Sequence, residues 1–150
     1  MESNYTLAKI GLLIKEGKIR KTHDMIVYLF QLWLERKGIS KENLIVLEEY
    51  KGLTPDIIVH INNNVLSVWE IIEPDPTWSL SDQTVRKKVE TMLIKAYAFV
   101  YHPKAIILSD GMRMYIYDGN GKLISEINDI SEINVKKEKE IEQIVKGKLT

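Results

Sequence analysis

The spacing of apolar side chains predicts two helices before residue 40. Apolar residues recur every three or four positions in "NYTLAKIGLLIKEGK" and again in "THDMIVYLFQLWLERKG", which is the period of an amphipathic helix. Asn4 or Thr6 is suited to cap the first helix and Gly17 to end it. Thr22 and Gly38 have the same roles in the second.

The middle of the chain changes to the pattern of strands, which are short, β-branched and bounded by turn residues. We expect strands over 43–50, 56–61, 65–72, 104–110 and 112–118, with an edge strand over 122–127. Asn62-Asn63-Asn64 predicts a tight hairpin, because asparagine tolerates a positive φ.

Two further helices are predicted. The first covers about 83–101 and turns an apolar stripe inward, formed by Val85, Val89, Leu93, Ala96 and Val100. A charged helix over about 134–147 follows the last strand, with lysine and glutamate at spacings that form i,i+4 pairs. The order α-α-β-β-β-α-β-β-(β)-α predicts a single α/β domain over 1–150, with a mixed central sheet flanked by helices.

Composition narrows the class of protein. The chain has 150 residues with no net charge and no cysteine, which excludes a strongly cationic nucleic-acid binder, a disulfide framework and a thiolate metal site. No apolar run approaches the roughly 20 residues that span a bilayer, and no signal-peptide pattern is present, so we expect a cytoplasmic protein without membrane contact. The Ile, Lys and Glu bias fits an archaeal or thermophilic source, and an AT-rich genome equally well.

Candidate chemistry lies in "TPDIIVHINNNVLSVWEIIEP". The predicted hairpin places Asp56 and Glu70 at one end of the sheet, where two carboxylates can hold Mg²⁺ or Mn²⁺. Glu48 or Glu49 on the preceding strand would add a further carboxylate. The plainer interpretation is a strand start after proline and a charge at the sheet edge, but a carboxylate inside "VLSVWEII" is costly without a donor or cation.

This arrangement resembles the PD-(D/E)XK nuclease superfamily, specifically the N-terminal nuclease domain of type I restriction-enzyme R subunits. The resemblance covers Thr22 to Asp118 and rests on "LERKG", "NLIVLEEY", "TPDIIVHINNN", "VWEIIEP", the helix with Tyr97, and "AIILSDGMRMYIYD". It implies a restriction-endonuclease-like fold and metal-dependent hydrolysis of DNA. Asp56 and Glu70 would be the catalytic metal ligands, and other protein subunits would be partners.

Two positions depart from the family pattern. A lysine is expected two residues after the metal-binding glutamate, where this chain has Ile72, and a glutamine is expected four residues before Tyr97, where it has Leu93. The lysine orients the attacking water and offsets developing negative charge. Isoleucine does neither.

Three explanations follow. The basic group has migrated to the long helix, at Arg86, Lys87, Lys88 or Lys95; or Glu73 or a metal-bound water replaces it; or the site is degenerate and the scaffold is an adaptor that binds protein or nucleic acid. Two apolar residues on facing elements can pack together and close the pocket, which favours the third explanation.

Other side chains have open interpretations. Arg86, Lys87 and Lys88 are suited to DNA phosphates or form a solvated helix face, and Trp78 is suited to stack on a base or to pack. We expect Tyr97 in the core. The three histidines, at positions 23, 60 and 102, show no metal-ligand spacing.

Overall fold

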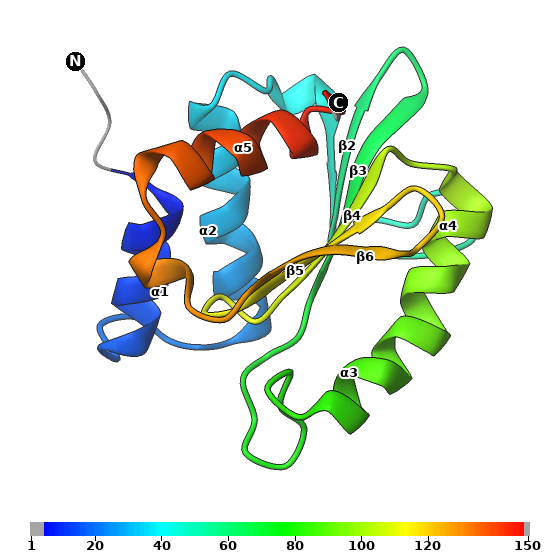
Figure 1. The fold of residues 1–150 in the computed structure, drawn as a ribbon. Coiled ribbons are helices and arrows are strands. Elements are labelled where there is room, and N and C mark those ends of the chain that lie inside the picture. The colour runs from blue at the N-terminus through cyan, green and yellow to red at the C-terminus, as the bar shows by residue number, and fades with distance from the viewer. Residues whose placement is uncertain (1–4, 149–150) are drawn as a thin grey trace.

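The computed structural model describes residues 5–148 and shows a six-stranded mixed sheet with helices on both faces (Figure 1). The strands follow one another across the sheet in sequence order, and all neighbours are antiparallel except β3 and β4, which are parallel. They are β1 (Leu44–Val46), β2 (Ile57–Ile61), β3 (Asn64–Ile71), β4 (Ala105–Ser109), β5 (Met114–Asp118) and β6 (Leu123–Ile127).

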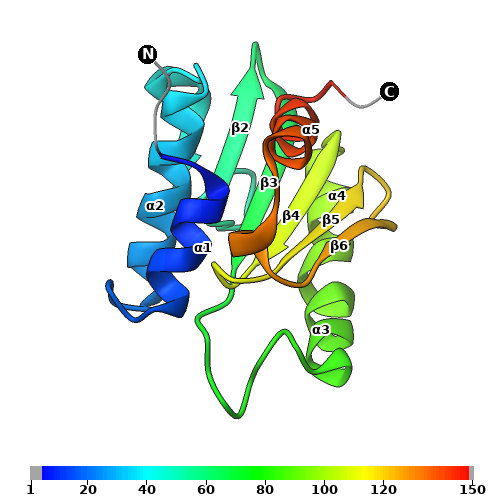
Figure 2. The ribbon, with the colours of Figure 1, turned by 60° about the vertical axis from the view of Figure 1, so that its left-hand side comes forward.

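Three helices cover one face of the sheet and one long helical segment covers the other (Figure 2). The first group is α1 (Leu7–Lys15), α2 (His23–Arg36) and α5 (Val135–Val145). The long segment joins β3 to β4 and consists of α3 (Gln83–Val89), the π-helical turn η2 (Glu90–Ile94) and α4 (Lys95–Tyr101). The 3₁₀ turns η1 (Lys41–Asn43) and η3 (Ile130–Glu132) complete the elements.

Local signals in the sequence explain most of these elements. The hydroxyl of Thr6 accepts from the Lys9 N–H at 3.0 Å and begins α1, and Thr22 begins α2 in the same way. Asn62 and Asn63 have φ of 51° and 67°, so the predicted hairpin forms with two left-handed residues, as a type I′ turn requires.

The first predicted strand is shorter than expected. Pairing with β2 ends at Val46, because Leu47 takes a φ of 55° and leaves the extended conformation. Lys51 does the same in a small turn closed by a bridge between Tyr50 and Leu53. Residues 47–50 therefore lie outside the sheet.

Each face of the sheet has its own apolar core. Trp69 and Ile71 of β3 pack with α1, α2 and α5, where the Trp69 ring lies 5.2 Å from that of Phe30. Val68 and Ile72 pack instead on the side of α3 and α4. Side chains alternate along the strand predicted for 65–72, and this places position 72 on the same side as the Glu70 side chain, which bonds to α4.

A π-helical turn changes which side chains the long helix buries. Val85 and Val89 point inward as expected, but beyond η2 the buried residues are Ile94, Tyr97 and Tyr101. Leu93 and Val100 of the predicted stripe are half-buried and pack against this core, but the fully buried line is displaced by one position, because a π turn adds a residue. Tyr97 is buried, as expected, and its hydroxyl reaches β3.

The C-terminal helix is anchored by a buried carboxylate as well as by surface pairs. Glu138 accepts from the Leu7 N–H at 2.7 Å and the Trp33 indole at 3.3 Å, and it pairs with Lys37 at 3.1 Å. These contacts join α5 to α1 and α2. Within residues 5–148, no helix is both long and apolar enough to cross a bilayer.

Candidate functional site

Asp56 is hydrogen-bonded to Trp69 and Ile71, the two residues on either side of Glu70. Its backbone N–H donates to the Trp69 carbonyl at 3.0 Å, and its carboxylate accepts from the Ile71 N–H at 2.6 Å. The structure therefore brings Asp56 next to Glu70 at the end of β3, as the predicted hairpin required.

The two carboxylates lean toward different helices. Glu70 accepts a 2.5 Å hydrogen bond from the Tyr97 hydroxyl of α4, while Asp56 Oδ1 lies 2.7 Å from Nε2 of His23 at the start of α2. The acidic pair, meaning Asp56 and Glu70 from here on, thus sits at the end of the sheet between the two helical layers.

Burial and mutual repulsion perturb both acids. Burial raises the pKa of Glu70 to about 7, and the neighbouring Asp56 charge acts in the same direction against Tyr97 and His23. Burial also raises the pKa of Asp56, and the Ile71 N–H and His23 offset this only in part. A pair of carboxylates in this state is expected to favour a cation.

His23 is a site residue that the sequence did not indicate. Its Nδ1 lies 2.8 Å from Asp24 Oδ1 and its Nε2 faces Asp56, so both ring nitrogens have a carboxylate partner. Burial lowers the pKa of His23, but the bonds to Asp24 and Asp56 outweigh it and raise the pKa above its ordinary value. The imidazolium form supplies a positive charge to the acidic pair.

The two apolar replacements lie beside this site. Ile72 and Leu93 are both half-buried, and both pack against the core on the side of α3 and α4. Glu73 serves another purpose, because its carboxylate accepts from the His23 N–H at 2.7 Å and caps α2. Glu48 and Glu49 are exposed in the segment that leaves β1 and not on the strand itself.

Arg86, one of the candidates for a migrated basic group, makes its contacts away from the acidic pair. Its guanidinium lies 4.7 Å from the Tyr115 ring centre and pairs at 3.8 Å with Glu90 and at 3.7 Å with Glu126. It is therefore directed toward β5 and β6, and the π turn between Arg86 and Leu93 removes the common face.

The lysines of the long helix point outward. Lys87, Lys88 and Lys95 are all exposed, and Lys95 precedes Tyr97 by two residues, a spacing at which side chains do not share a helix face. Lys88 Nζ lies 5.7 Å from the centre of the Trp78 ring. The structure therefore joins Lys88 to Trp78 and separates the helix lysines from the acidic pair.

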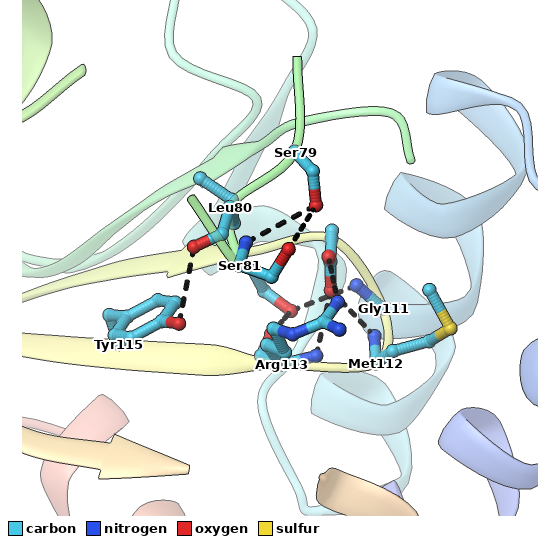
Figure 3. A network of polar contacts seen from close by, with 9 residues as sticks. Ser79, Leu80, Ser81, Gly111, Met112, Arg113 and Tyr115 are labelled. Atoms are coloured by element: carbon cyan, nitrogen blue, oxygen red, sulfur yellow. Dashed lines mark hydrogen bonds and ion pairs between the residues drawn. The ribbon is translucent and has the colours of Figure 1, made fainter. Parts of the chain in front are cut away.

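A further basic side chain, Arg113, lies in the turn that follows β4, next to the backbone of Ile72. The Ile72 N–H donates to Ser109 at the end of β4, and Asp110 then holds Arg113 through a 3.1 Å ion pair and a 2.7 Å bond to its N–H. Figure 3 shows this turn below the 79–81 loop, where the Tyr115 hydroxyl reaches the Leu80 carbonyl. The turn was predicted only as a link between strands.

The oxygen ligands of the acidic pair suit a hard divalent cation. Mg²⁺ is commonly held by one or two carboxylates, with water and substrate phosphate completing its shell. Among the residues that the structure describes, no three His, Asp or Glu side chains are gathered as a ready metal cage. Asp56 and Glu70 are the ligands that the arrangement offers, with His23 next to Asp56.

Comparisons with known proteins returned no relatives. No family model, no curated protein and no solved structure matches this chain.

The raised pKa of Glu70 predicts a measurable penalty on stability. Between about pH 4.5 and 7 the folded protein holds a proton on Glu70 that the unfolded chain has lost, so stability falls as pH rises through this window. Without divalent cations, Glu70→Gln should leave stability unchanged near pH 4 and raise it by about 3 kcal/mol at pH 8. Urea unfolding across this range measures the difference, with Glu49→Gln as the exposed control; parallel curves for Glu70→Gln and the wild type would contradict it.

Proposed function

We propose that this protein has a restriction-endonuclease-like fold and acts on DNA as a weakly active, Mg²⁺-dependent phosphodiester hydrolase. The observation that carries the proposal is the bonding of Asp56 to the residues on either side of Glu70. A buried and a half-buried carboxylate at the ends of neighbouring strands, with raised pKa values, are a costly arrangement unless a cation is bound.

Asp56 and Glu70 would hold the metal ion. When bound, it would polarise a phosphate and lower the pKa of a coordinated water. The chain orients the ligands itself: the Ile71 N–H fixes one oxygen of Asp56, and the Tyr97 hydroxyl fixes one oxygen of Glu70. A preorganised ligand pair reduces the cost of assembling the site.

The residues around the acidic pair support low activity. Ile72 stands where a lysine would orient water, and Leu93 packs on the same side. Of the cations considered, Arg86 is engaged by Glu90 and Glu126. Arg113 is paired with Asp110 in the turn whose Ser109 carbonyl accepts from the Ile72 N–H, so it is the next basic group to test.

The second candidate is a catalytically inactive adaptor that binds protein or nucleic acid through the same scaffold. His23 supports it, because an imidazolium 2.7 Å from Asp56 compensates the acidic pair without a metal ion. Ile72 and Leu93 then close the pocket as ordinary core residues.

Metal calorimetry separates the two candidates. The wild type should bind Mn²⁺ at pH 7.5, and Asp56→Asn should abolish the heat, because the charge of Asp56 is half of the carboxylate set. Glu49→Gln, which removes an exposed carboxylate outside the sheet, should bind as the wild type does. A wild type that binds no Mn²⁺ at millimolar concentration favours the adaptor.

Restoring the two missing polar groups tests the origin of low activity. Ile72→Lys combined with Leu93→Gln should raise Mg²⁺-dependent DNA cleavage by roughly 10²-fold or more, the range of positioned acid–base assistance. The variant must first show a cooperative thermal transition, because a lysine placed among apolar side chains can lose its proton or destabilise the fold.

If the double variant folds and binds metal but cleaves neither DNA nor RNA, the proposal that the protein is a hydrolase is contradicted. Efficient cleavage by the wild type instead shows that another basic group replaces the lysine. Arg113→Ala is then the variant to measure first, with Lys139→Ala, an exposed lysine on α5, as the control.

A further inference from the structure

The outward face of the long helical segment carries exposed apolar and basic side chains that the acidic pair does not use. Met92 is 68% exposed and Phe99 is 79% exposed. Lys87, Lys88 and Lys95 are exposed on the same segment. We call these five residues, together with Trp78, the outer strip.

The helical part of the outer strip has one sign of charge, whereas the exposed carboxylates of Asp75 and Asp82 flank Trp78 in the preceding loop. From 83 to 104 the chain holds a single carboxylate, Glu90, and it is turned inward, where it accepts a 2.6 Å bond from the Tyr117 hydroxyl and pairs with Arg86. The whole protein has as many acidic as basic residues. A local positive strip on a neutral protein selects an anionic partner.

Aromatic rings stand at both ends of the lysines. Trp78 is 38% exposed and lies beside Lys88, and Phe99 follows Lys88 by 11 residues. At about 1.5 Å per helical residue this distance is about 16 Å, which corresponds to about five nucleotides stacked at roughly 3.4 Å each.

The spacing favours unpaired nucleotides over the other anionic partners. Bases in a duplex are stacked on each other and offer no face to a protein ring, whereas bases of a single strand stack on exposed aromatics while lysines contact the phosphates. An apolar partner helix could cover Met92, Ala96 and Phe99, which follow the spacing i, i+4 and i+7. It would leave the exposed charges of Lys88 and Lys95 on the same face without a partner.

We propose that the outer strip binds single-stranded nucleic acid, with bases stacked on Trp78 and Phe99 and phosphates held by Lys87, Lys88 and Lys95. This inference deepens the proposed action on DNA and rests on it for the biological substrate. The strip itself lies on the outer side of the helix whose inner side presents Tyr97 to Glu70.

Tryptophan fluorescence can test this inference directly. Of the three tryptophans, Trp33 and Trp69 are fully buried, so Trp78 is the one that a ligand can reach. An eight-nucleotide oligothymidylate, added in EDTA, should quench the emission, and Trp78→Phe should remove the quenching. Three phosphate contacts predict a slope of about −2 for log affinity against log salt concentration.

Matched variants separate stacking from charge. Phe99→Ala should weaken oligothymidylate binding by about tenfold or more, whereas Tyr28→Ala, which removes an exposed ring from α2, should not. Lys87→Gln with Lys95→Gln should reduce the magnitude of the slope by about 1.4. Lys139→Gln on α5 should leave it unchanged.

Several outcomes overturn the inference. The inference is contradicted if oligothymidylate does not quench the fluorescence, or if Phe99→Ala binds it as well as the wild type does. It is also contradicted if a blunt duplex binds more tightly than the single strand. Displacement of the oligonucleotide by an equally charged polyglutamate contradicts it as well, and indicates an acidic protein partner instead. EDTA removes metal ions from this assay, so it is independent of the calorimetry. If the protein binds Mn²⁺ but no oligonucleotide, the proposed role of the outer strip is wrong, and the proposed metal site is unaffected.

Discussion

The rest of the site depends on one electrostatic constraint, the placing of Asp56 beside Glu70 at a desolvated end of the sheet. Two carboxylates there repel each other, and each needs donors that the sheet alone does not provide. The Ile71 N–H serves Asp56, His23 reaches it from α2, and Tyr97 reaches Glu70 from α4. Helices on both faces therefore converge on this end of the sheet. The π turn contributes directly, because without the extra residue Tyr97 would not lie on the buried face.

The same constraint connects the structure to function. A protein that needed only a stable sheet would gain by replacing one of the carboxylates with an apolar residue, since a buried acid with a pKa near 7 costs stability at neutral pH. A ligand that offsets this cost would explain why both acids are present, and in the proposed function that ligand is a divalent cation. His23 provides a competing solution within the chain. Whether His23 or a metal ion compensates the pair distinguishes the adaptor from the hydrolase, and Ile72 sets how active the hydrolase can be.

Much of the fold follows from local patterns, and most of the site does not. The sequence predicts the features that depend on neighbouring residues. These are the caps at Thr6 and Thr22, the asparagine hairpin and the strand that carries Glu70. The shift of the buried face beyond Glu90 is not predicted, because a π turn arises from packing that no short-range pattern records. His23 was missed for a similar reason: its partner Asp56 is close in space and distant in sequence, so ligand spacing along the chain gave no signal. The contact of Arg86 with Glu126 of β6 is equally long-range.

Titration of the Glu70 side-chain carboxyl by ¹³C NMR, without and with Mg²⁺, tests the central claim most directly. If the acidic pair is a cation site, Glu70 should titrate near pH 7 in EDTA, and saturating Mg²⁺ should move that transition down by more than one pH unit, because the metal ion favours the ionised form. Asp56→Asn should remove most of the metal-dependent shift. A Glu70 transition near pH 4.5, or one that Mg²⁺ leaves in place, would contradict the account.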